Sequence, residues 1–304
     1  MRAMYLYTGA ADVASYTGDK GYMDAMKGVW EDVVYRNMYI TGGIGSSGNN
    51  EGFSIDYDLP NENAYCETCA SVGMVFWNQR MNQLTRDTRY LDVLERSLYN
   101  AANDGLSMDG KLFFYGNPLA SDGRHKRREW FGTACCPSNI ARLVESLGSY
   151  IYATSANGVF VNLFIASSTS VRLSSGNLLL DLKTEYPWEG KVSVTVTPEK
   201  KKAKFPLNIR IPGWVLGHPV PGDTYQYLNY SGSQYTLKVN GQPTAYSLEN
   251  GYAVIEREWK KGDVLEADFP MEVRRVVAKQ EVKDDLNRVA LERGPLVYCF
   301  EHPD

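Results

Sequence analysis

The sequence predicts an α + β multidomain protein in which a helical region is followed by β-sandwich domains. Before residue 153 apolar residues recur at helical spacing, and after it they alternate with a period of two. Segments rich in Gly, Asn and Pro separate the alternating stretches, as turns separate the strands of a sandwich. We therefore expect three parts: helices over 1–152, a β-sandwich over 153–275, and the start of a further β segment over 276–304.

Four segments of the first part have the apolar stripe of a buried helix, and the N-terminal residues also read as the interior of a helix. The four are 20–37, 67–81, 88–104 and 137–153, with Pro137 expected at the first helical position of the last. The sequences YMDAM (22–26) and YLDVL (90–94) resemble each other, and a loop containing Gly follows each helix. A recurring unit of helix and loop is typical of a helical toroid.

The second part contains short alternating segments that predict strands. These are NGVFVNLFIAS, NLLLDLKTEYP, GKVSVTVTP, LNIRIPGW, YTLKVNGQ, YAVIEREWKKGDVLEADFP and RVALERGPLVYCF. Asn240-Gly241 predicts a tight hairpin turn, because both residues tolerate a positive φ. This density of strands predicts one complete sandwich and part of another.

Composition excludes two classes of partner. The net charge of −4 provides no basic face for nucleic acid, and no apolar run reaches the ~18 residues that a membrane span needs. The N-terminus lacks a signal-peptide pattern, and we expect the natural start to lie upstream. The compartment, bacterial-type cytoplasm or periplasm, and the oligomeric state, a homodimer included, are left open by the sequence.

The five cysteines predict a metal site rather than a disulfide framework. Their number is odd, and four of them form two tight pairs, Cys66 with Cys69 and Cys135 with Cys136. By spacing alone these four would make a four-thiolate zinc site. Glu67 offers an oxygen ligand instead, but it could share a metal with Cys69 only at a helix end or in extended backbone. Cys299 is expected to be a buried cysteine in a strand.

The long segment 39–70 is expected to be functional, because loops of this length on compact scaffolds seldom only connect. Its TGGIG stretch follows a helix and lacks a following Lys-Ser/Thr, which argues against a phosphate loop. Glu51 in this segment is a candidate general acid/base. Cys135 and Cys136 stand at the N-terminal edge of a predicted helix, where the helix dipole and a bound cation would favour the thiolate. His125, His218 and His302 are expected to lie in loops or on the surface.

The motifs YITGGIGSSGNNEGF, DYDLPNENAYCETCA and FGTACCPSNIARL together resemble glycoside hydrolase family 127, the β-L-arabinofuranosidases. The likeness extends through DGKLFFYGNPL, LNIRIPGW and ERGPLVYCF. It implies a catalytic (α/α)6 barrel followed by β-sandwich, jelly-roll-like domains. Because fewer helices are predicted here than such a barrel contains, 1–152 would be its C-terminal part. The activity of this stretch alone is therefore left open.

The resemblance also implies the site residues. A Zn²⁺ would be held by Glu67, Cys69, Cys135 and Cys136, with Glu67 in place of Cys66. Cys135 would be the nucleophile and Glu51 the acid/base, and Tyr115 would line the sugar pocket. The expected activity is retaining hydrolysis of β-L-arabinofuranosides in a plant-type, arabinose-containing glycan or oligosaccharide.

Two readings of other classes compete with the enzyme. The first is a non-catalytic carbohydrate-binding protein in which zinc is structural and the sandwich binds glycan. The second is a thiol redox protein that uses Cys66 and Cys69, although the βαβ context of thioredoxin-like proteins is absent from the predicted elements.

Overall fold

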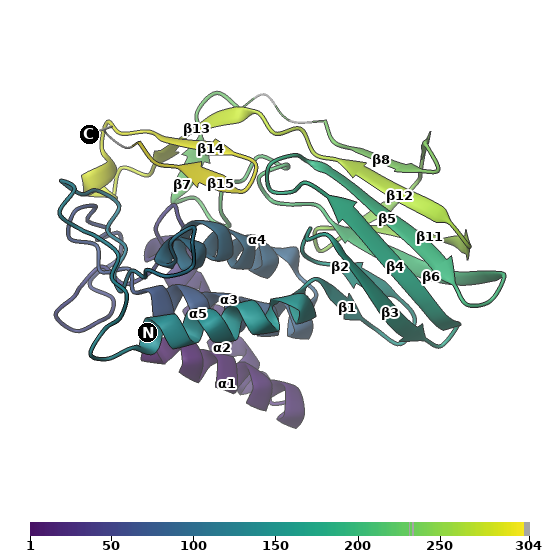
Figure 1. The fold of residues 1–304 in the computed structure, drawn as a ribbon, viewed down its shortest axis with the longest axis horizontal. Coiled ribbons are helices and arrows are strands. Elements are labelled where there is room, and N and C mark those ends of the chain that lie inside the picture. Colours follow the sequence, from purple (N-terminus) through teal and green to yellow (C-terminus); the bar gives the residue numbers. More distant parts are fainter. Residues whose placement is uncertain (231, 233, 301–304) are drawn as a thin grey trace.

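The computed structural model describes residues 1–230, 232 and 234–300, and within them five α-helices precede the strands. Figure 1 shows the helices packed together, with the large sheets beside them and a smaller sheet over α4. The helices are α1 (Arg2–Thr17), α2 (Lys20–Arg36), α3 (Thr68–Thr85), α4 (Thr88–Ser97) and α5 (Cys135–Ser146). The prediction of a helical part followed by β-sheet parts is confirmed.

Two aspartates determine where helices begin. The side chain of Asp19 accepts hydrogen bonds from the backbone N–H groups of Gly21 and Tyr22 at the start of α2. Asp87 accepts one from the Arg89 N–H at the start of α4. Such caps satisfy amides that have no partner inside the helix. The helix expected over 88–104 is α4 followed by a π-helical turn (Leu98–Ala102) and a 3-10 turn (Asn103–Gly105), so the helical path is continuous but changes its winding.

Helix α3 is the centre of the helical part, and it packs against α1, α4 and α5. Nearly every residue of its first four turns is buried, Met74 and Trp77 among them, which explains why its sequence is apolar on all sides. The Trp30 indole N–H of α2 donates to the Asn78 side chain at 2.7 Å, so a buried polar group of α3 is satisfied. This bond ties the middle of α3 to α2.

The strands form three sheets. The bounds are β1 (Tyr152–Thr154), β2 (Val159–Val161), β3 (Ser167–Leu173), β4 (Gly176–Thr184), β5 (Lys191–Pro198), β6 (Lys202–Arg210), β7 (Tyr225–Tyr227), β8 (Thr236–Val239), β9 (Gln242–Pro243), β10 (Ser247–Glu249), β11 (Tyr252–Lys260), β12 (Asp263–Asp268), β13 (Val273–Ala278), β14 (Ala290–Arg293) and β15 (Leu296–Tyr298). The first sheet has the order β1-β2-β6-β11-β10, the second β3-β4-β5-β12-β8-β9, and the third β15-β14-β13-β7.

The first and second sheets enclose one apolar core, which makes them a sandwich. Asn240 and Gly241, with φ values of 53° and 76°, form the hairpin turn between β8 and β9 as predicted. Strands β1, β3, β7, β10 and β13 lie in segments where the sequence predicted none. Strand β1 begins inside the segment predicted as a helix over 137–153, because α5 ends at Ser146 and a 3-10 turn (Leu147–Tyr150) follows it. Strand β13 crosses the expected boundary at 275/276 and pairs with β7, so the third sheet combines strands from both sides of that boundary.

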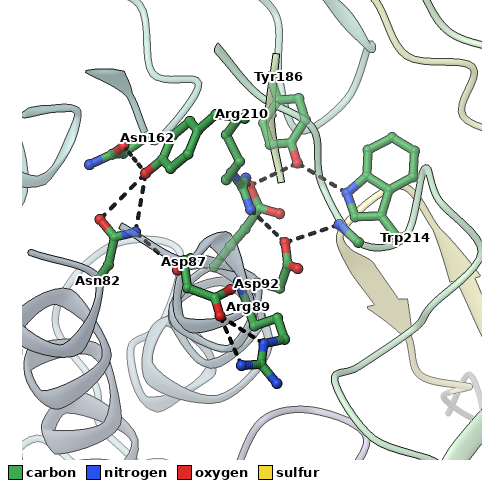
Figure 2. Close-up of polar contacts among 11 residues, drawn as sticks. Asn82, Asp87, Arg89, Asp92, Asn162, Tyr186, Arg210 and Trp214 are labelled. Atoms are coloured by element: carbon green, nitrogen blue, oxygen red, sulfur yellow. Dashed lines mark hydrogen bonds and ion pairs between the residues drawn. The ribbon is translucent and has the colours of Figure 1, made fainter. Parts of the chain in front are cut away.

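A buried polar network joins the sandwich to α4 (Figure 2). Arg210 at the end of β6 is 0% exposed, donates to Asp92 at 3.0 Å and also pairs with Glu95. Tyr186 donates to the same Glu95 carboxylate at 2.8 Å, and the Gly213 N–H donates to Asp92 at 3.0 Å. Because charged groups are buried only when paired, this network fixes the sandwich against the helical part.

A second buried ion pair anchors the third sheet. Arg96 of α4 lies 2.7 Å from Glu292 of β14, and both side chains are almost fully buried. Asn100, in the π-helical turn, donates to the Pro295 carbonyl at 2.9 Å.

In the part of the chain that the structure describes, no helix has both the length and the apolarity to cross a membrane.

Candidate metal centre and active site

The segment before α3 and the segment around Tyr115 meet at the first turn of that helix. The Thr68 N–H, which has no partner inside the helix, donates to the Tyr115 carbonyl at 2.9 Å. The Thr68 hydroxyl donates to the Phe114 carbonyl at 2.9 Å. These two bonds hold the Tyr115 side chain beside the residues that begin α3.

Four side chains converge at this place from two helices. Glu67 precedes α3, Cys69 lies in its first turn, and Cys135 and Cys136 are the first two residues of α5. Their ligand atoms all lie within 4.8 Å of one another. The Cys69 and Cys136 sulfurs are 3.3 Å apart, those of Cys135 and Cys136 are 3.9 Å apart, and the Cys135 sulfur is 3.6 Å from a Glu67 oxygen.

This arrangement fits a tetrahedral metal ion. With Zn–S bonds of about 2.3 Å, the sulfur ligands of tetrahedral zinc lie about 3.8 Å apart. The observed S···S distances of 3.3 and 3.9 Å lie on either side of that separation. Glu67 is 1% exposed, and its second carboxylate oxygen, Oε2, has no hydrogen-bond partner among the described residues. A buried carboxylate oxygen without a partner is costly, and a cation at this place would compensate it.

The raised pKa values of the cluster residues also indicate a place for a cation. Burial raises the pKa of Glu67 and of Cys135, and the neighbouring Cys136 thiol together with burial raises the pKa of Cys69. Three thiolates and one carboxylate could not be ionised together here without a positive charge. The dipoles of α3 and α5, whose N-terminal ends lie here, supply part of it, and a divalent cation would supply the rest.

The start of α5 corrects one prediction. Pro137 was expected at the first helical position, but α5 begins two residues earlier, at Cys135. The first-turn amides have no partner inside the helix, so a proline can occupy the third position as well as the first. The two cysteines are therefore part of the first turn, and the backbone of the helix fixes their relative orientation.

Aromatic residues connect the cluster to Glu51. The Tyr115 hydroxyl oxygen lies 3.3 Å from the Cys135 sulfur, and the Tyr115 and Tyr65 ring centroids are 6.3 Å apart. The Tyr65 hydroxyl lies 3.5 Å from a Glu51 carboxylate oxygen, whose partner oxygen is 3.7 Å from the Arg2 guanidinium. Glu51 itself has a positive φ of 52° and a half-exposed carboxylate, so it can meet a solvent-borne substrate.

Comparison with known proteins decides the family. Residues 1–149 match the family described as β-L-arabinofuranosidase, GH127 catalytic domain. Residues 158–271 match the GH127 middle domain, and residues 273–304 match the glycoside hydrolase family 127 C-terminal domain. The chain belongs to glycoside hydrolase family 127. The three matches follow one another in the order of the helical part, the sandwich and the third sheet.

Relatives within GH127 agree in sequence and in fold. A non-reducing end β-L-arabinofuranosidase of Bifidobacterium longum subsp. longum is 40% identical over all of this chain, which spans 46% of that protein. A solved GH127 β-arabinofuranosidase is 46% identical with a TM-score of 0.94, over 97% of this chain and 46% of the other. The GH127 β-L-arabinofuranosidase of Geobacillus stearothermophilus T6 is 40% identical with a TM-score of 0.88, over the same shares of the two chains. The chain thus spans about half the length of these relatives.

In this GH127 chain the geometry separates the predicted ligands from the other cysteines. Cys66, the ligand favoured by spacing alone, lies instead in an apolar cluster with Tyr39, Leu59 and Val282. Burial raises the pKa of its thiol. Cys66 and Cys69 are both free thiols, so the disulfide of the redox reading is not formed in the structure. Cys299 was expected to be buried in a strand, but it is exposed and lies just beyond β15, so that prediction was wrong.

Two of the three histidines lie on the surface, and the third lies outside the residues that the structure describes. His125 and His218 are exposed in loops, as expected, and His302 lies outside the described residues.

The TGGIG stretch is packed against α4: Ser97 donates to the Gly42 carbonyl at 2.9 Å, and a Cβ at Gly42 would lie 2.7 Å from the Ser97 nitrogen. Gly42 therefore allows the close packing of this stretch against α4.

Two residues near the cluster were not foreseen. Asn139 donates from α5 to the Cys69 sulfur at 3.3 Å, and Tyr65 stands between Glu51 and Tyr115. Asn139 could have been found by helical spacing, because it lies one turn after Cys135. Tyr65 precedes the helix in irregular backbone, where no periodicity indicates the direction of a side chain.

Proposed function

We propose that this chain carries the zinc site and the two catalytic side chains of a retaining β-L-arabinofuranosidase. The observation that carries the proposal is the convergence of Glu67, Cys69, Cys135 and Cys136, with Tyr115 against the one sulfur that is only half-buried. Cys69 and Cys136 are fully buried, so Cys135 is the cluster thiol that a substrate could reach. A purely structural site would enclose all of its ligands.

Glu67, Cys69, Cys135 and Cys136 would hold the zinc ion. When bound, zinc would supply the positive charge that keeps the Cys135 sulfur ionised at neutral pH. Asn139 donates to the Cys69 sulfur and so orients that ligand. Tyr115 would offer its hydroxyl to the Cys135 sulfur and hold it on the side of the substrate.

The reaction would proceed in two displacements. The Cys135 sulfur attacks the anomeric carbon while the Glu51 carboxyl gives its proton to the departing glycosidic oxygen. A thioglycosyl bond to Cys135 forms as the C–O bond breaks. Water then attacks the same carbon, the Glu51 carboxylate takes its proton, and the C–S bond breaks to release the sugar with its configuration retained. The substrate class would be arabinofuranosides of plant-type glycans.

Replacement of the two side chains tests the assignment. In the full-length protein, Cys135→Ser and Glu51→Gln should each lower hydrolysis of an aryl β-L-arabinofuranoside by at least about a hundredfold. Glu62→Gln, an exposed carboxylate in the same loop, and Cys299→Ser serve as matched controls and should retain activity. Near-normal hydrolysis by either test variant would contradict the assigned role.

A covalent probe separates this enzyme from the carbohydrate-binding alternative. A haloacetamide analogue of L-arabinofuranose should alkylate Cys135 in the folded protein and leave the buried Cys69 and Cys136 unmodified. Peptide mass spectrometry locates the adduct. If the protein holds its full complement of zinc and no cysteine of the cluster reacts, the zinc is structural. That outcome would favour a non-catalytic carbohydrate-binding protein.

A further inference from the structure

Two aromatic pairs join the segment that carries Tyr115 to the segment just before Cys135. Tyr115, whose hydroxyl is 3.3 Å from the Cys135 sulfur, meets the edge of the Phe131 ring with centroids 5.4 Å apart. Phe113, two residues before Tyr115, meets Trp130 edge to face with centroids 6.5 Å apart. One pair is therefore at the sulfur, and the other joins the same two segments two residues before Tyr115 and one residue before Phe131.

The backbone holds these pairs in place. Phe113 and Arg128 exchange two backbone hydrogen bonds of 2.8 and 2.9 Å, which sets the segment before Cys135 against the segment that ends at Tyr115. Phe114 lies between Phe113 and Tyr115 in the sequence but has other neighbours: it stacks on His125 with centroids 4.6 Å apart and lies under the Arg127 guanidinium at 4.2 Å. Phe113, Phe114 and Tyr115 thus contact different neighbours. Phe113 is the one that packs against Trp130.

Trp130 is one of two exposed tryptophans of this chain. It is 63% exposed and Trp188 is 61% exposed, whereas Trp30, Trp77, Trp214 and Trp259 are each 4% exposed or less. Of the two, Trp130 contacts Phe113, which lies two residues before Tyr115. A large apolar ring left in solvent beside a candidate catalytic residue indicates a binding surface. The electron-rich face of an indole attracts polarised C–H groups, and the rings of sugars present such groups on one face.

We propose that Trp130, supported by Phe113, is the stacking platform for the sugar unit on the leaving-group side of the scissile bond. This inference rests on the proposed glycosidase function. Tyr115 touches the Cys135 sulfur, so it would line the position of the sugar under attack. Trp130 lies against Phe113 and is exposed to solvent, where the remainder of a glycan must lie while its terminal sugar is held at the sulfur. Trp130 then selects substrates whose leaving group is itself a sugar.

Comparison of two substrates tests the platform. In the full-length protein, Trp130→Ala should lower kcat/KM for a β-L-arabinofuranosyl disaccharide by about tenfold, through KM. Hydrolysis of methyl β-L-arabinofuranoside, whose leaving group cannot stack, should stay within about twofold of wild type. Trp130→Phe should retain most of the disaccharide activity. Trp188→Ala is the matched control, because Trp188 is 61% exposed in the turn between β4 and β5. This substitution should leave kcat/KM unchanged for both substrates.

Two outcomes would overturn the proposal: an unchanged KM for the disaccharide, or equal losses on both substrates, which would show a general structural role. If the wild-type protein hydrolyses no arabinofuranoside, the proposed function fails, and the platform is judged by binding alone. In the Glu51→Gln protein the disaccharide should then cause a saturable change in tryptophan fluorescence that Glu51→Gln/Trp130→Phe lacks. An identical change in both proteins would refute the platform independently of the reaction.

Discussion

The sulfur atoms of Cys69 and Cys136 lie 3.3 Å apart although 67 positions separate the two residues in the sequence. Each stands in the first turn of a helix, Cys69 in α3 and Cys136 in α5. The two helices therefore direct their N-terminal ends at the same point. Because helix N-termini stabilise negative charge, the fold itself prepares this place for thiolate ligands.

Cys136→Ser should remove most of the bound zinc, because one of four ligands is lost from a fully buried position. Zinc content after gel filtration, measured by plasma mass spectrometry, should fall from about one ion per chain to a small fraction of that. Cys299→Ser leaves the cluster intact and is the control. Retention of a full zinc complement by Cys136→Ser would mean that the metal is held elsewhere.

Zinc binding should also stabilise the fold, because the cluster joins α3 to α5. Free zinc at about a hundred times its Kd would add about 2.7 kcal/mol to the free energy of unfolding. Thermal unfolding followed at buffered zinc concentrations should therefore show Tm rising with free zinc. In Cys69→Ser this dependence should disappear, and a Tm that does not respond to zinc in the unaltered protein would contradict the prediction.

The division into helices and strands could be predicted because it depends on local periodicity. Helix α2 was expected over 20–37 and lies over Lys20–Arg36. Strand β3 was missed because its sequence, SSTSVRL, is mostly polar, and its pairing with β4 decides its structure. Strand β13, VRRVVA, is mostly apolar but short, and its pairing with β7 and β14, which lie at quite different distances along the chain, decides its structure.

The metal site shows the limit of spacing arguments. Cys-x-x-Cys favoured Cys66 as a ligand, but the positive φ of Cys66, 37°, belongs to a backbone turn just before α3, and its side chain lies in an apolar cluster. Glu67 takes the place in the four-ligand cluster because it is the residue that precedes the helix, where its extended ψ of 131° lets it reach the same point as Cys69. From the sequence, Glu67 and Cys69 could share a metal only at a helix end or in extended backbone, and in the structure Glu67 directly precedes α3.

Gly116→Ala should disturb the site through the backbone. A Cβ at Gly116 would lie 2.7 Å from the Tyr65 carbonyl oxygen, which cannot move without shifting the segments that carry Tyr65 and Tyr115. We expect a loss of about 1–3 kcal/mol in unfolding free energy, together with reduced hydrolysis. Urea titration and kinetics measure the two effects.

The matched control for Gly116→Ala is Gly132→Ala, because nothing lies within 4 Å of a Cβ at Gly132 although it is also close to Cys135 in sequence. This control should change neither stability nor activity. If both substitutions were neutral, the close approach of Gly116 to Tyr65 would have no bearing on the position of Tyr115.

Arg210→Met should destabilise the chain strongly, because it leaves Glu95 without its cation in the buried network between the sandwich and α4 (Figure 2). Removal of one partner from a buried ion pair costs about 3–5 kcal/mol, since the other charge stays buried without compensation. Denaturant unfolding should show this loss. The double variant Arg210→Met/Glu95→Gln should recover part of it, because only one of the two carboxylates that pair with Arg210, Asp92, then remains without its cation.

The control for the network is the exposed pair Lys202–Glu258, whose atoms are 2.9 Å apart but whose side chains are 57% and 46% exposed. Lys202→Met should change the free energy of unfolding by less than about 1 kcal/mol, because water screens a surface pair. If Arg210→Met were as mild as Lys202→Met, the network would not be what fixes the sandwich to α4. The apolar contacts between the two parts would then have to account for their attachment.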